Sequence, residues 1–250
     1  MLHNDVLEFC EYNNSKLKEH KRVVDLLVSF IREIVKNIFY NEFDVHIFGS
    51  HSTDLSLTWS DIDLCLVNKL RSNSNNNNYT TTSILRTLNN KLQDEPWLMN
   101  CLLIENTTIP ILKIEANDNY LNYHIDISVQ DSKHFGLKCV DLVRLYLKEY
   151  EVLQPLTITL KNILKSADLN DPYKGGLSSY GLILLIISFL QNKKNEKNNI
   201  HINDDNLGKL LIDFLAYYST IFDPSSYIVQ TYLPNTNNLD PIQVIKYILF

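Results

Sequence analysis

The segment that decides the fold is residues 48–67, Phe-Gly-Ser-His-Ser-Thr-Asp-Leu-Ser-Leu-Thr-Trp-Ser-Asp-Ile-Asp-Leu-Cys-Leu-Val. A strand-like run, Val45–Phe48, leads into a Gly-Ser turn, and a second strand-like run extends from Asp61 to Val67. Successive side chains of a strand point to opposite faces, so we expect Asp61 and Asp63 to share one face. Two like charges side by side repel, and a divalent cation between them would explain their placement on an apolar strand.

The Gly49-Ser50 turn offers backbone N–H groups and a hydroxyl to an anion such as a phosphate, especially if a helix begins there. Taken alone, the turn is typical of any loop, and the Asp pair is typical of a solvated strand edge. Their conjunction is more specific, because Asp61 follows Ser50 by eleven residues and each motif adjoins an apolar run. Together they predict nucleotide chemistry.

A third strand is indicated by the strict alternation of Tyr123–Val129. Its polar face carries His124, Asp126 and Ser128, and its apolar face carries Ile125, Ile127 and Val129. On its own Asp126 is typical of a surface residue. In one sheet with Asp61 and Asp63 it would complete a three-carboxylate metal site.

Composition places the chain among soluble globular proteins: 250 residues, 45% of them hydrophobic, suffice for one large domain or two small ones. The longest apolar run, Gly181–Leu190, is too short to span a bilayer, and the first residues do not resemble a secretory signal. The four cysteines have no Cys-x-x-Cys spacing, which argues against a zinc site and fits free thiols. We expect an intracellular protein of the nucleus or cytoplasm that does not bind membranes.

The net charge of −6 does not favour binding to a polyanion, because affinity for nucleic acid comes mainly from Lys and Arg. If the substrate is nucleic acid, either a small local basic patch or a partner must hold it. One basic cluster consists of Lys16, Lys18, Lys21 and Arg22, next to a polar break at residues 13–15. A solvated face is its default interpretation, and an RNA contact is the alternative.

Hydrophobic periodicity predicts the remaining elements. Residues 2–38 have helical spacing, which we interpret as a short helix, a polar break at 13–15 and a longer helix. Asn-rich residues 71–83 predict a loop, 84–92 a helix, and 109–114 a strand. Further helices are expected at 137–150, 153–164, 178–191 and 207–218, with a loop at 193–205.

Two features of the helical part suit a nucleotide. Lys161 and Lys165 lie four residues apart, hence on one helix face; they are either solvated or available to neutralise phosphate charge. Gly175-Gly176 precedes a helix that begins with Ser178-Ser179-Tyr180. The serines suit a phosphate contact, whereas ordinary N-capping by Ser178 explains one serine but not the two glycines.

These motifs resemble the DNA polymerase β-type nucleotidyltransferases, and more closely the poly(A) polymerases of the TRAMP surveillance complex and their terminal uridylyltransferase relatives. The matching segments follow the family's order over residues 2–220. They are Leu2-His3 with Leu7-Glu8-Phe9, Phe48-Gly49-Ser50, Ser60–Leu64, Ile109–Lys113, Ile125–Ser128, Gln154-Pro155-Leu156, Leu160-Lys161, Leu169-Asn170 and Gly175–Tyr180.

The resemblance implies an α+β, two-lobed nucleotidyltransferase with its active site between the lobes. Residues 38–137 would form a small mixed β-sheet catalytic lobe that carries the three carboxylates. Residues 1–37 and 138–250 would form a helical central lobe built from both chain ends.

The resemblance also implies two groups of site residues. The catalytic ligands of two Mg²⁺ or Mn²⁺ ions would be Asp61, Asp63 and Asp126, with Asp126 on the ion that activates the primer 3′-hydroxyl. The nucleotide-binding residues would be Gly49, Ser50, Lys161, Lys165, Ser179 and Tyr180. Tyr180 would stack on the base, which does not select among bases because every base has a π-face.

Three departures from the family pattern concern substrate choice. The family places an Asn before the Gly that opens the helix after the third strand, whereas His134-Phe135 precedes Gly136 here, which puts ribose discrimination in question. Leu239-Asp240-Pro241 resembles the element that precedes the family's base-reading segment, yet the sequence ends nine residues later. No His follows His201, and the uridylyl-specific relatives use a late His, so the pattern favours ATP over UTP.

The expected function is template-independent addition of AMP from ATP to RNA 3′ ends by two-metal-ion catalysis. A terminal uridylyltransferase that uses UTP is one alternative. The other is a catalytically inactive nucleotidyltransferase-fold subunit that binds RNA or a partner. The RNA 3′ end and an NTP are the expected partners, together with an RNA-binding protein such as a zinc-knuckle subunit.

Overall fold

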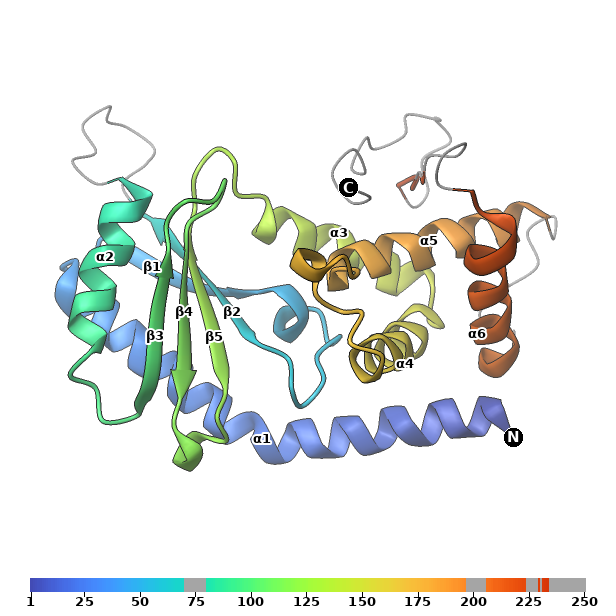
Figure 1. The fold of residues 1–250 in the computed structure, drawn as a ribbon, viewed down its shortest axis with the longest axis horizontal. Helices are drawn as coiled ribbons and strands as arrows, with labels where there is room; N and C mark the ends of the chain where they lie inside the picture. The colour runs from blue at the N-terminus through green and yellow to red at the C-terminus, as the bar shows by residue number, and fades with distance from the viewer. Residues whose placement is uncertain (70–79, 197–205, 224–228, 230, 234–250) are drawn as a thin grey trace. The chain divides into compact units, whose positions relative to one another are not determined.

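The computed structural model describes residues 1–69, 80–196, 206–223, 229 and 231–233. The chain divides into two compact units, residues 15–141 and residues 1–14 with 142–250. The predicted α+β class is confirmed: one unit holds a sheet with helices, and the other is helical and uses both chain ends (Figure 1). Residues 15–37, which were expected in the helical lobe, lie in the sheet unit.

The sheet is mixed and five-stranded, in the order β1-β2-β5-β4-β3 (Figure 1). Its strands are β1 (Phe43–Phe48), β2 (Ile62–Asn68), β3 (Leu98–Ile104), β4 (Ile111–Ala116) and β5 (His124–Val129). β2 and β5 run parallel, and the pairs β1/β2, β4/β5 and β3/β4 are antiparallel. The strands expected at 45–48, 61–67, 109–114 and 123–129 are confirmed as β1, β2, β4 and β5.

One face of the sheet forms the core of this unit together with α1 (Leu2–Ile38) and α2 (Thr81–Leu92). The strands contribute Ile62, Leu64, Leu66, Leu112, Ile114, Ile125, Ile127 and Val129 to it. The helices contribute Leu27, Val28, Ile31, Ile34, Val35, Ile84, Leu85, Leu88 and Leu92, at helical spacing. Because side chains alternate along a strand, Asp63 and Asp126 belong to the opposite face.

The expected break in the first helix is wrong, because α1 is continuous from Leu2 to Ile38. Asn13 is 3% exposed inside this helix. Asn and Ser cost only roughly half a kcal/mol relative to Ala in a helix, and no Pro or Gly lies within α1, so packing of its apolar side chains outweighs the polar run.

β3 is a strand that no periodic pattern in the sequence predicts. Its residues, Leu-Met-Asn-Cys-Leu-Leu-Ile, show no polar alternation, and pairing with β4 along most of its length makes it a strand. The loop expected at 71–83 is wrong at its end: Thr81 to Ser83 are the first turn of α2, and Thr80 Oγ1 accepts a hydrogen bond from the Ser83 N–H at 3.1 Å. Residues 70–79 lie outside the described part.

The helical unit contains α3 (Gly136–Glu149), α4 (Leu153–Ser166), α5 (Ser179–Glu196) and α6 (Leu207–Ala216). The start of α1 belongs to this unit: the Leu207 N–H donates to His3 Nδ1 at 3.0 Å, and a side chain at Gly208 would collide with Leu2 and His3. The loop expected at 193–205 is wrong up to Glu196, where α5 continues, and residues 197–205 are not described. No helix within the described ranges is long and apolar enough to cross a membrane.

Candidate active site

Asp63 and Asp126 are register partners on the parallel strands β2 and β5. Their side chains therefore lie on the same face, and neighbouring strands are only about 4.8 Å apart. Both residues are partly buried, whereas Ile62, Leu64 and Ile125 on the reverse face are fully buried. The fold thus brings together two like charges that carry a repulsive cost unless a cation lies near them.

Lys113 supplies a cation at this level of the sheet. It is the register partner of Asp126 on β4, and its Nζ lies 2.8 Å from Asp126 Oδ2. The Asp126 side chain is 18% exposed and that of Lys113 is 44% exposed, so solvent weakens the pair. Lys113 was missed as a site residue because its contact depends on strand order, which alternation does not reveal.

Gly49 lies beside the carboxylate of Asp63. A Cβ built at position 49 would overlap Asp63 Oδ2 and lie 2.8 Å from its Cγ. The backbone φ of Gly49 is also +64°, a conformation that other residues rarely adopt. The Gly-Ser turn continues as one turn of 3₁₀ helix, Gly49–Ser52. Both the backbone conformation and the lack of space for a Cβ therefore require glycine at position 49.

Buried leucines and local hydrogen bonds fix the segment between this turn and β2. Leu55 and Leu57 are 0% and 2% exposed, and Ser60 Oγ accepts a hydrogen bond from the Leu57 N–H at 2.9 Å. His51 Nε2 donates to the Ser60 carbonyl at 3.2 Å. This anchoring fixes the backbone just before Asp61, which is exposed and precedes the first residue of β2.

The donor set suits a hard divalent cation, which prefers carboxylate oxygens, and Asp63 with Asp126 carries more negative charge than Lys113 offsets. In the described ranges, however, no three His, Cys, Asp or Glu side chains lie close enough together to hold a metal ion. The structure therefore brings Asp63 and Asp126 together and does not gather Asp61 with them. The pair fits a metal in chemistry and charge, and the three-ligand set stays a prediction.

A second cluster lies two residues further along both strands, where Cys65 and Ser128 are register partners and contact His134. A thiol beside an imidazole suggests a nucleophile. Burial raises the pKa of Cys65 to about 12, and burial also lowers the pKa of His134 below its ordinary value. Both groups are then neutral near pH 7, so the contact is an ordinary weak hydrogen bond rather than a thiolate–imidazolium pair.

The predicted nucleotide-binding residues of the helical unit lie on two helices. Lys161 and Lys165 are on α4; Lys161 is 4% exposed, whereas Lys165 is exposed. Ser178 Oγ accepts a hydrogen bond from the Gly181 N–H at 3.0 Å, so the capping interpretation of Ser178 is confirmed. Ser179 is then the exposed first residue of α5, and Tyr180 is partly buried.

Gly175 and Gly176 have a structural explanation. Gly175 has φ of +83° at the end of the 3₁₀ turn Pro172–Lys174. A Cβ on Gly176 would lie 2.5 Å from the Leu169 carbonyl oxygen. The tight loop before α5 thus requires both glycines, whether or not a phosphate binds there.

Comparisons with known proteins identify the family of the chain. The family model "Poly(A) RNA polymerase, mitochondrial-like, central palm domain" matches residues 2–148, a span that includes Asp61, Asp63 and Asp126. The chain belongs to this poly(A) RNA polymerase family. Poly(A) RNA polymerase protein 1 of Saccharomyces cerevisiae is 32% identical over 224 residues, which cover 88% of this chain and 33% of that protein. The chain thus spans about a third of the length of this curated relative.

A solved structure of the polymerase core of TRAMP, an RNA surveillance complex, superimposes with a TM-score of 0.71 at 28% identity, covering 88% of this chain and 65% of that one. One family relative carries a different name. The inactive non-canonical poly(A) RNA polymerase protein Trf4-2 of Drosophila melanogaster is 28% identical over 227 residues, which cover 89% of this chain and 52% of that protein. Membership of the family therefore does not by itself decide activity.

Proposed function

We propose that the protein is a nucleotidyltransferase that adds AMP from ATP to the 3′ end of RNA without a template. The observation that carries the proposal is the side-by-side placement of Asp63 and Asp126, with Gly49 against the Asp63 carboxylate. The glycine lets the backbone of the Gly-Ser turn approach the Asp63 carboxylate closely, and the names of the relatives favour polyadenylation.

In the proposed reaction the 3′-hydroxyl oxygen of RNA attacks the α-phosphorus of ATP and loses its proton to solvent. A new O–P bond forms, and the bond between the α-phosphorus and the bridging oxygen of the β-phosphate breaks to release pyrophosphate. Two Mg²⁺ or Mn²⁺ ions, when bound, would supply the charge that stabilises the attacking and leaving oxygens. Asp63 and Asp126 would hold them with Asp61. Without a metal ion, Lys113 offsets the charge of Asp126. A bound ion would have to share the Asp126 carboxylate with Lys113.

The remaining predicted residues would bind the nucleotide. Gly49 and Ser50 would contact its triphosphate through backbone N–H groups and a hydroxyl. Lys161 and Lys165 would offset charge on the departing pyrophosphate, and the exposure of Lys165 suits contact with a ligand from solvent. Ser179 would add a hydroxyl and Tyr180 a stacking surface for the base.

The residues named so far explain neither the choice of base nor the binding of RNA. ATP is preferred over UTP in the proposal because the named relatives are poly(A) RNA polymerases. The net charge of −6 is unfavourable for holding RNA, so we propose that a partner with its own RNA-binding surface, such as a zinc-knuckle subunit, delivers the substrate in the nucleus or cytoplasm.

An inactive subunit with the same fold is the second candidate. The ion pair between Lys113 and Asp126 and the existence of an inactive relative favour it. Such a subunit would bind nucleotide or RNA without turnover.

One assay separates these functions. Labelled oligo-RNA is incubated with each NTP in turn and Mg²⁺ or Mn²⁺, with Asp63→Asn as the site variant and Asp44→Asn, an exposed strand carboxylate paired with Lys69, as the matched control. We expect ladders with ATP for the parent and the control and none for Asp63→Asn. Ladders with UTP alone would overturn the choice of base. Nucleotide binding without extension by any NTP would support the inactive subunit.

A further inference from the structure

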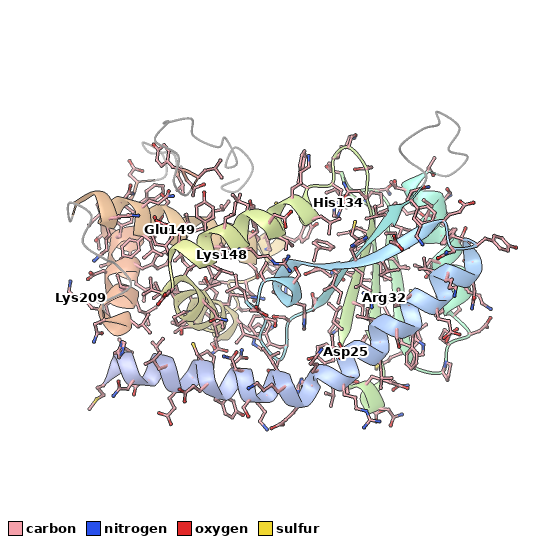
Figure 2. The ribbon with its side chains drawn as sticks, turned by 180° about the vertical axis from the view of Figure 1, so that it is seen from behind. Asp25, Arg32, His134, Lys148, Glu149 and Lys209 are labelled. Carbon is pink, nitrogen blue, oxygen red and sulfur yellow. The ribbon has the colours of Figure 1, made fainter. Side chains whose placement is uncertain are left out.

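We infer that His134 is a positioning residue of the proposed site, because its ring holds Phe48 and thereby keeps the Gly49 turn against Asp63. The inference rests on the proposed function and adds to it a residue that touches no substrate. His134 lies in the connection between β5 and α3 (Figure 2).

The imidazole is anchored at the inner end of this connection. His134 is 5% exposed, and its Nε2 lies 2.8 Å from Ser128 Oγ. Ser128 donates its own proton to the Leu64 carbonyl at 3.3 Å, so its oxygen is free to accept from the Nε2–H. The other ring nitrogen, Nδ1, lies 3.8 Å from Cys65 Sγ. The ring is therefore fixed to the same face of β2 and β5 that carries the carboxylates.

The backbone around His134 is fixed as well. The Gln130 side-chain amide donates to two carbonyls, that of Asp131 at 3.0 Å and that of His134 at 2.9 Å. The Lys133 N–H donates to Asp131 Oδ1 at 2.8 Å, which closes the turn. These contacts fix the backbone at His134, and the fixed backbone holds the imidazole in position. The ring can therefore act as a rigid support.

The outer edge of the ring supports Phe48 and Gly136. The Phe48 and His134 rings meet edge to face, with centroids 5.2 Å apart at 78°. A Cβ on Gly136 would lie 2.7 Å from the Phe48 ring and 2.8 Å from His134 Cε1. The first residue of α3 is thus packed between the two rings, and no larger residue fits there.

Phe48 connects this support to the site. It is the register partner of Asp63 on β1, and the next residue is Gly49, which lies against the Asp63 carboxylate. If the imidazole is removed, the Phe48 ring can move into the vacated space, and Gly49 moves with it. A merely structural histidine would lower stability without changing how the carboxylates bind a cation, and this difference is measurable.

Three variants and one control divide the contributions. His134→Ala removes the ring and the hydrogen bond. His134→Phe keeps a ring against Phe48, and Ser128→Ala keeps the imidazole but removes its acceptor together with the hydrogen bond to the Leu64 carbonyl. Leu92→Ala is the matched control, because it opens the buried core of the same unit at a residue that takes no part in these contacts. Circular dichroism confirms that each variant is folded before binding is compared.

The experiment measures Mn²⁺ binding by electron paramagnetic resonance, without RNA or turnover, and then the KM values for ATP and RNA. We expect His134→Ala to weaken Mn²⁺ binding roughly tenfold and to raise the KM for ATP but not for RNA, and His134→Phe to recover most of the loss. Unchanged Mn²⁺ affinity in folded His134→Ala, or an equal loss in Leu92→Ala, would overturn the inference. If the parent binds Mn²⁺ but extends no RNA, the proposed function fails while the comparison of affinities still tests His134.

Discussion

Gly49 lies so close to Asp63 that any side chain at position 49 would overlap the Oδ2 atom of that carboxylate. Within the sheet unit, this contact joins the Gly-Ser turn to the strand pair β2/β5, on which Asp63 and Asp126 are register partners. A shift of the turn would therefore also displace the Asp63 carboxylate.

Gly49→Ala should test this contact. An alanine would be strained at φ of +64°, at a cost of about 1 kcal/mol, and would displace the Asp63 carboxylate as well. We expect extension of RNA to fall at least about a hundredfold while the fold persists. The measurement is primer extension together with circular dichroism. Ser52→Ala in the same turn, which removes one hydrogen bond to the Gly49 carbonyl, is the milder comparison.

Asp126→Asn should separate metal binding from folding. The substitution removes the repulsion with Asp63 and also the ion pair with Lys113, so the stability without metal should change by less than about 1 kcal/mol. Stabilisation by Mg²⁺ should disappear, because a ligand that binds the folded state raises the melting temperature only while its site exists. Thermal melts with and without Mg²⁺ measure both. A full Mg²⁺ response in the variant would remove Asp126 from the ligand set, and Asp44→Asn should keep that response.

Lys113→Met should raise the affinity for Mg²⁺. Lys113 Nζ forms an ion pair with Asp126 Oδ2 at 2.8 Å, and an ion that binds this oxygen must compete with the lysine. Without metal the variant should lose less than about 1 kcal/mol, because the lysine side chain is 44% exposed. Titration of the melting temperature with Mg²⁺ gives the half-saturating concentration. An increase in that concentration would mean that Lys113 assists the ion rather than competing with it.

The apolar run of β2 and the alternation of β5 located the two strands that carry the paired carboxylates, because each strand buries apolar side chains on one face. These patterns could not show that Asp63 and Asp126 are register partners, since strand order depends on contacts between residues about 60 apart in the chain. For the same reason the contact of Lys113 with Asp126 was missed. The spacing of Asp61 and Asp63 did predict a shared face, but β2 begins at Ile62, so Asp61 falls outside the strand.

His134 shows the limit of motif comparison. The sequence identified it only as a departure before Gly136, with no contact assigned. Its position is determined by Ser128, Cys65 and Phe48, which lie on three different strands. β3 was missed for a related reason: its apolar residues lack a period, and only pairing with β4 makes it a strand. Local pattern predicts elements, and contacts between distant segments determine the rest.

The pH dependence of stability should report on the buried His134. Burial holds its pKa in the folded state below the ordinary value of 6.5, with the carboxylate of Asp131 opposing this shift. Well above pH 6.5 the residue is neutral in both states and adds no pH dependence. As the pH falls below 6.5, the unfolded chain takes up a proton that the folded state resists, so the free energy of unfolding decreases, by at most about 1.4 kcal/mol per pH unit.

Urea titrations between pH 8 and pH 5 measure this slope through tryptophan fluorescence, because Trp59 and Trp97 both lie in the sheet unit. His134→Phe cannot be protonated, so its unfolding free energy should decrease less than that of the parent as the pH falls below 6.5. His20→Phe is the matched control, since His20 also contacts an aromatic side chain of this unit, that of Tyr123. Parallel slopes for the parent and His134→Phe would show that the imidazole becomes protonated in place, and its neutral hydrogen bond to Ser128 would then be the wrong assignment.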